Sequence, residues 1–83
     1  MARNMKEKSV GRYIVSDPRI CHGEPTFRGT RILVADVLEQ VASGLAWRCI
    51  VEEWRGSISE EAIAEAVRAA TELFRGHAHE LAA

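Results

Sequence analysis

The sequence has few of the residues that build disulfide scaffolds and metal sites. Its 83 residues include two cysteines and three histidines. Cys21 and Cys49 lack a metal-type repeat, so we interpret both as reduced thiols. No apolar run approaches the roughly 18 residues that span a bilayer. Residues 1–10 are charged and lack the apolar core of a secretory signal. We therefore expect a cytoplasmic protein with no metal, cofactor or membrane contact.

Proline is equally scarce, and both prolines lie in residues 17–32. This stretch reads D-P-R-I-C-H-G-E-P-T-F-R-G-T-R-I. Proline fixes φ and donates no backbone hydrogen bond, while glycine supplies backbone angles that other residues resist. Apolar residues recur between these breakers at Ile20, Phe27 and Ile32. The pattern predicts a tightly shaped, non-helical segment of short strands joined by turns.

Two short strands are predicted at the beginning of the chain. Residues 11–16 are aromatic and β-branched and end at Ser16-Asp17-Pro18, and residues 26–28 are bounded by a proline and a glycine. Residues 1–10 have no period, and we expect them to form a flexible tail. Two strands alone are marginal in water, so this β element needs the helices or a second copy of itself.

Three amphipathic helices are predicted after this β element. Their expected ranges are 34–43, 46–54 and 59–75, each with apolar residues at i, i+3, i+4 and i+7. The hydrophobic fraction of 47% indicates one globular domain over residues 11–83, with a small core. Trp47 and Trp54 share one stripe. This stripe and the short strands predict a homodimer with either feature in the contact.

The helix ends carry signals of different strength. Ala46 precedes the second helix without a capping hydroxyl, so we expect this helix to be the least firmly started. Ser57 and Glu60 have the S-x-x-E spacing of a capping box, with Ser59 as the competing cap. Gly76 is the expected stop of the third helix.

A family resemblance rests on residues 17–32 and the helix that follows. The patterns D-P-x-I-x-x-G-x-P-x-F-x-G-T-R-I and V-x-D-V-L-x-x-x-A-x-G-L resemble a widespread prokaryotic family of small domains, often described as VapB-like antitoxins. The resemblance covers roughly residues 14–70. It implies a mainly α, three-helix, helix-turn-helix-like domain with a short N-terminal β element. The motif residues expected to be structural are Asp17, Pro18, Gly23, Pro25, Gly29, Thr30 and Arg31.

The same resemblance implies an antitoxin, or small DNA-binding regulator of a toxin–antitoxin operon, that neutralises a PIN-like nuclease. The alternative is a protein-interaction module that dimerises and has no affinity for DNA. If the protein is an antitoxin, the C-terminal part from Arg75 to Ala83 is the expected toxin-binding segment; the alternative is that this part is simply the frayed end of a helix. Phe74 and Leu81 would anchor in an apolar groove, and Arg75 would pair with carboxylates of the toxin.

Charge is unevenly distributed along the chain. Residues 1–32 carry seven Lys/Arg against three acids (+4), and residues 33–83 carry four arginines against nine acids (−5). A basic face could meet phosphates, or the two parts could balance each other between protomers. The predicted nucleic-acid-binding residues are Arg12, Arg28, Arg31 and Arg48. Arg31 has a rival role, since its guanidinium could tie down backbone carbonyls or Asp17.

Catalysis is not expected. Cys21 and His22 are adjacent, so in an extended segment their side chains point to opposite sides. His77 and His79 lack a third ligand at metal spacing. The acids of the second and third helices are interpreted as a solvated face, and they are Glu52, Glu53, Glu60, Glu61 and Glu65.

Overall fold

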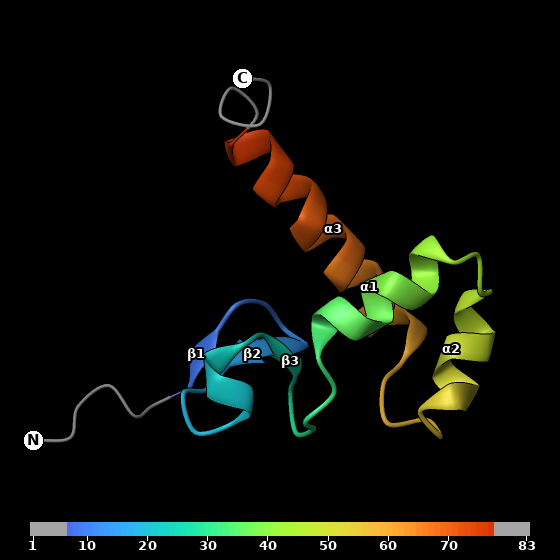
Figure 1. Ribbon diagram of the computed structural model, residues 1–83, viewed down its shortest axis with the longest axis horizontal. Coiled ribbons are helices and arrows are strands. Elements are labelled where there is room, and N and C mark those ends of the chain that lie inside the picture. Colours follow the sequence, from blue (N-terminus) through green and yellow to red (C-terminus); the bar gives the residue numbers. More distant parts are fainter. Residues whose placement is uncertain (1–6, 78–83) are drawn as a thin grey trace, which may run out of the picture.

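The computed structural model describes residues 7–77 as a small sheet and three helices (Figure 1). The elements in chain order are β1 (Lys8–Ser9), β2 (Ile14–Ser16), the 3-10 turn η1 (Cys21–Gly23), β3 (Thr26–Phe27), α1 (Val34–Ala42), α2 (Trp47–Glu53) and α3 (Glu60–Gly76). The predicted fold class, helix-dominant with a short N-terminal β element, is confirmed. None of the helices in residues 7–77 is long and apolar enough to span a membrane.

The sheet has three antiparallel strands in the order β1-β2-β3. Lys8 lies opposite Ser16 across β1 and β2, and Ile14 lies opposite Phe27 across β2 and β3. The expected tail over residues 1–10 is therefore wrong at its end, because Lys8 and Ser9 pair with β2. Residues 1–6 lie outside the described part of the chain. Strand β1, which was not predicted, therefore adds a third strand to the two predicted ones and pairs with β2.

The segment between β2 and β3 is a succession of tight turns. Cys21, His22 and Gly23 have φ of 51°, 58° and 86°. The expectation of an extended segment at Cys21 and His22 is wrong, because two overlapping turns close here. The N–H of Gly23 donates to the carbonyl of Ile20 at 3.0 Å, and that of Glu24 to Cys21 at 3.1 Å. The Ser16 hydroxyl also donates to the carbonyl of Gly23.

The three helices begin and end within one residue of the predicted bounds. Ser59 is the cap of α3, since its hydroxyl accepts the N–H of Ala62 at 3.1 Å. The capping box from Ser57 is wrong, because the N–H of Ser57 donates to Trp54 in the preceding turn. Helix α2 has no side-chain cap at Ala46, as expected. Gly76 is the last residue of α3 rather than the residue after it.

The core lies where the sheet, α1 and α2 meet the first half of α3. Its buried members are Ile14, Phe27, Val34, Val37, Ile50, Ile58, Ala62, Ile63 and Ala66. Trp47 and Trp54 are half-buried against this core. The indole N–H of Trp54 donates to the side-chain oxygen of Gln40 at 2.7 Å, which ties α2 to α1. The tryptophan stripe thus packs within the domain.

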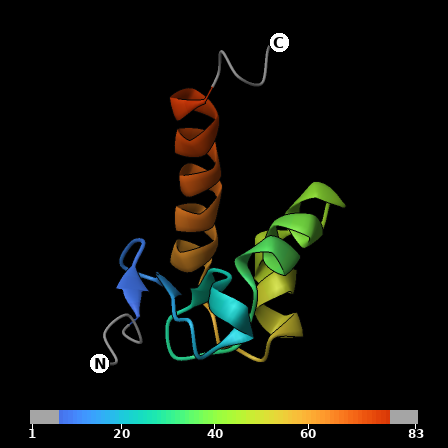
Figure 2. The same ribbon diagram turned by 60° about the vertical axis from the view of Figure 1, so that its left-hand side comes forward.

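Helix α3 is longer than the core it covers. Both views show the sheet, α1 and α2 gathered at its first turns, while its last turns extend beyond them (Figures 1 and 2). The apolar stripe of α3 continues along this distal part. As a result, Leu73 and Phe74 are 63% and 62% exposed.

Candidate functional site

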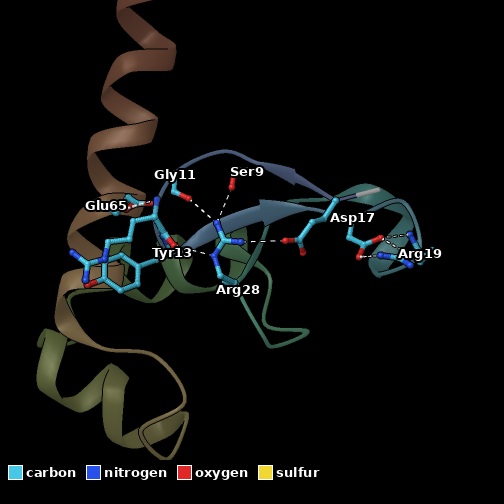
Figure 3. Close-up of polar contacts among 9 residues, drawn as sticks. Ser9, Gly11, Tyr13, Asp17, Arg19, Arg28 and Glu65 are labelled. Atoms are coloured by element: carbon cyan, nitrogen blue, oxygen red, sulfur yellow. Dashed lines mark hydrogen bonds and ion pairs between the residues drawn. The ribbon is translucent and has the colours of Figure 1, made fainter. Parts of the chain in front are cut away.

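The β1–β2 hairpin is held from one side by Arg28. Its guanidinium donates to the carbonyls of Arg12 and Gly11, both at 3.0 Å, and to the Ser9 hydroxyl at 2.8 Å (Figure 3). It also pairs with Glu7 at 3.2 Å. The sequence placed Arg28 among phosphate contacts. The guanidinium N–H groups of Arg28 are hydrogen-bonded within the protein. The orientation of this side chain is therefore explained without a bound nucleic acid.

The same hairpin is held from the other side by Glu65 of α3. Its carboxylate accepts the backbone N–H of Arg12 at 3.2 Å and that of Tyr13 at 3.0 Å. The interpretation of Glu65 as part of a solvated face is therefore wrong. The two partners are more than 50 positions apart in the chain, and a surface-helix pattern carries no signal for such a contact. The other four acids of that group are exposed.

Arg12 lies at the edge of a groove between the hairpin and the loop before α3. Its guanidinium carbon lies 5.4 Å from the centroid of the Tyr13 ring, a cation–π distance. The groove has a volume of about 380 Å³. Its lining residues are Arg12, Tyr13, Phe27, Arg28, Gly56, Ser57, Ile58, Ser59 and Ala62.

Asp17 is the most buried charged residue of the family motif, at 4% exposed. Arg19 donates to both of its carboxylate oxygens at 3.0 Å, and the Arg19 backbone N–H adds a third bond at 2.9 Å. These side-chain and then backbone hydrogen bonds hold the pKa of Asp17 below its ordinary value of 3.8. The alternative in which Arg31 ties down Asp17 is wrong, because Arg19 occupies both oxygens.

The other motif residues shape the turns around β3. The Thr30 hydroxyl donates to the carbonyl of Phe27 at 2.8 Å and accepts the N–H of Ile32 at 2.9 Å. Gly29 precedes it with φ of 79°, a conformation that favours glycine. The carbonyl of Pro25 accepts the N–H of Val34 at the start of α1. Pro18 is exposed within the first of these turns. The motif therefore encodes the path from β2 to α1.

The remaining predicted site residues are spread over the surface. Arg31 follows Thr30, and Arg48 lies in the first turn of α2. Both are exposed, and within residues 7–77 neither guanidinium has a hydrogen-bonding partner. The expectation that the Arg31 guanidinium ties down backbone carbonyls is therefore also wrong. Arg75 forms an exposed pair with Glu72 at 3.8 Å. Phe74 is exposed beside it, and Leu81 lies outside the described residues.

The two cysteines are free thiols, as expected, and both are half-buried. The Cys21 thiol points to the carbonyl of Arg31 at 3.8 Å. Within residues 7–77, no three metal-ligating side chains come together.

The family model described as "Protein of unknown function (DUF433)" matches residues 14–69. The chain belongs to this DUF433 family. Its matched segment contains the turn motif, the core and the side chains of Arg28 and Glu65. The hairpin residues that these two side chains contact lie before residue 14 and so outside the match. The match ends before Leu73 and Phe74.

Comparison with solved structures gives a related fold. The DUF433 chain is similar to the protein in "X-ray crystal structure of Rv2018 from Mycobacterium tuberculosis", with 28% identity and a TM-score of 0.58. The match covers 65% of this chain and 24% of that one, so it spans about a quarter of that protein's length. No curated protein matches the chain.

Proposed function

We propose that this DUF433 protein is a cytoplasmic, non-catalytic antitoxin that neutralises a PIN-like nuclease by binding it with the distal part of α3. The observation that carries the proposal is the exposure of two adjacent large apolar side chains, Leu73 at 63% and Phe74 at 62%. Contiguous exposed apolar surface on a small soluble domain is typical of a protein-binding site. The resemblance to VapB-like antitoxins supplies the class of partner.

The position of these two side chains on α3 supports a role in binding a partner. Leu73 and Phe74 follow buried Ala66 at i+7 and i+8, so they continue the face that packs into the core. Burial of one such side chain is worth about 1.5–3 kcal/mol. The pair therefore supplies several kilocalories per mole to a partner with a matching groove.

Arg75 adds a charged contact in the same turn. Its pair with Glu72 is long at 3.8 Å, and the two side chains are 75% and 72% exposed. Exposed pairs of this kind contribute little to stability, so Arg75 can exchange Glu72 for a partner's carboxylates. A PIN-like nuclease holds its metal with carboxylates, which an arginine fork suits. Leu81 would extend the apolar contact.

The test is rescue of cells that express the nuclease encoded next to this chain's gene. The double variant Leu73→Ser/Phe74→Ser and a deletion of residues 77–83 should each keep the fold and weaken rescue. Arg68→Ala is the matched control, since Arg68 is an exposed residue of the same helix. Full rescue by the double variant, or an adjacent gene that encodes no nuclease, would contradict the proposal.

The second proposed activity is binding of operator DNA, by a homodimer of the chain. The exposed guanidinium groups of Arg31 and Arg48 favour contacts to phosphates. Glu60 and Glu61 begin α3, so base reading by that end of α3 is disfavoured. A gel shift with the promoter of the chain's own operon separates this activity from a protein-interaction module without DNA affinity. Light scattering at micromolar concentration tests the homodimer, and a monomer mass would count against it.

A further inference from the structure

The backbone on either side of the Arg12 α-carbon is fixed by two charged side chains. The N–H of Arg12 donates to Glu65, and its carbonyl accepts from the Arg28 guanidinium at 3.0 Å. The next residue is held in the same way. The N–H of Tyr13 donates to Glu65, and its carbonyl accepts the backbone N–H of Arg28 at 2.7 Å. All four backbone groups of Arg12 and Tyr13 are therefore hydrogen-bonded.

The side chain of Arg12 is positioned but not neutralised. Its guanidinium lies over the ring of Tyr13, and among residues 7–77 no carboxylate pairs with it. Arg28, the other arginine of the groove, is taken up by the hairpin. An anchored backbone and a stacked side chain reduce the entropy that Arg12 loses on binding an anion. Arg12 is thus a pre-organised cation at the edge of a groove.

The groove beside Arg12 combines an apolar floor with polar edges. Phe27, Ile58 and Ala62 form the floor, each 4% exposed or less, and Tyr13 adds a half-buried ring. Ser57 also lines the groove and is exposed. A volume of about 380 Å³ accommodates one or two side chains.

We propose that this groove binds a segment of a protein partner that presents one carboxylate beside one apolar side chain. The carboxylate would pair with the guanidinium of Arg12, whose planar fork suits two oxygens. The apolar side chain would cover Phe27 and Ile58. Charge complementarity at Arg12 and the apolar floor together define this ligand.

The acids around the groove favour a single carboxylate over a nucleic acid. Glu65 contacts the backbone of Arg12 directly. Glu60 and Glu61 lie in α3 between Ser59 and Ala62, which both line the groove. None of these three acids lines the groove itself, but their negative charges on the same helix disfavour the continuous charge of a phosphate backbone, whereas one carboxylate can approach Arg12 alone. The groove is also separate from the distal part of α3, so its role does not depend on Leu73 and Phe74.

The experiment is a selection from a phage-displayed library of random 12-residue peptides on the immobilised full chain. Wild type should enrich Asp or Glu beside Leu, Ile or Phe. Arg12→Ala should lose at least tenfold of the binding of these peptides. Arg68→Ala, a change at an exposed arginine of α3 that does not line the groove, should bind them as wild type does. Arg12→Glu should select Lys or Arg instead. Ser57→Leu should block the groove without changing Arg12.

Several results would overturn the inference. They are the absence of any enriched peptide, an enriched set without acids, and equal binding by wild type and Arg12→Ala. A fourth is displacement of the selected peptides from the groove by a 20-base-pair DNA duplex. NMR would show this if the duplex shifted the same amide signals of residues 56–59 that the peptides shift. That result would assign the groove to nucleic acid. Cooperative thermal unfolding of each variant shows that the fold is kept.

Discussion

The carboxylate of Glu65 occupies the space that a β-carbon on residue 11 would need. A β-carbon built on Gly11 would overlap the side-chain oxygen and carbon atoms of Glu65. The lack of a side chain at Gly11 therefore allows Glu65 to reach the N–H groups of Arg12 and Tyr13. Gly11 and Glu65 together fix how the hairpin sits on α3.

This relationship predicts that Gly11→Ala and Glu65→Ala have the same consequence. In Gly11→Ala, the flexible end of Glu65 must swing away, so both hydrogen bonds to the hairpin are lost. Each variant should lower the free energy of unfolding by about 1–3 kcal/mol, the usual cost of hydrogen bonds to a charged group. The double variant should be little worse than either single one, because the same contact is removed. Urea denaturation measures all three, and strictly additive losses would contradict the account.

Substitution of Thr26 by valine should not destabilise the protein. The Thr26 side chain is fully buried, and its hydroxyl has no hydrogen-bonding partner in the described structure. Thr26→Val replaces that hydroxyl by a methyl group of similar size, so stability should be unchanged or rise by about 1 kcal/mol. Thr30→Val is the matched control, since its hydroxyl makes two bonds. It should lose about 1–2 kcal/mol. A larger loss at Thr26 than at Thr30 would show that the Thr26 hydroxyl has a partner.

The ion pair between Asp17 and Arg19 should make the folded protein less stable in acid. The folded-state pKa of Asp17 is lowered by Arg19, so the folded protein binds fewer protons than the unfolded chain. The contribution of the ion pair is therefore complete above the unfolded-state value of about 4. It is lost as the pH falls through the folded-state pKa. The difference in Tm between wild type and Asp17→Asn should be constant from pH 7 to 5 and shrink towards pH 2.

Arg28 and Arg31 should differ in what they affect. Arg28→Ala removes four hydrogen bonds that hold the hairpin, so its main effect should be a lower Tm. Arg31→Ala removes an exposed side chain and should change stability by less than about 0.5 kcal/mol. If the chain binds its operator, Arg31→Ala should lower the slope of log K against log salt by about one. A stable Arg28→Ala variant with weakened DNA binding would restore Arg28 as a phosphate contact.

The helices were predictable because their signal is local. Spacing of apolar residues placed all three, and the prolines and glycines between residues 17 and 32 indicated turns. The left-handed backbone at Cys21 and His22 was not predicted, because residues other than glycine adopt it only rarely, although histidine does so more often than most. The Glu65, Arg28 and Gln40 contacts were missed for another reason. Each joins elements whose relative placement is set by the core, and a single polar residue does not encode it.

Binding of a protein partner by the distal part of α3 can be measured by calorimetric titration. The purified chain would be titrated into the nuclease encoded by the adjacent gene, with wild type and Leu73→Ser/Phe74→Ser compared. Wild type should bind the nuclease, and the variant should lose at least 100-fold in affinity, equivalent to about 3 kcal/mol. Equal affinity of the two proteins, with the fold of the variant intact, would place the partner surface elsewhere and contradict the proposal.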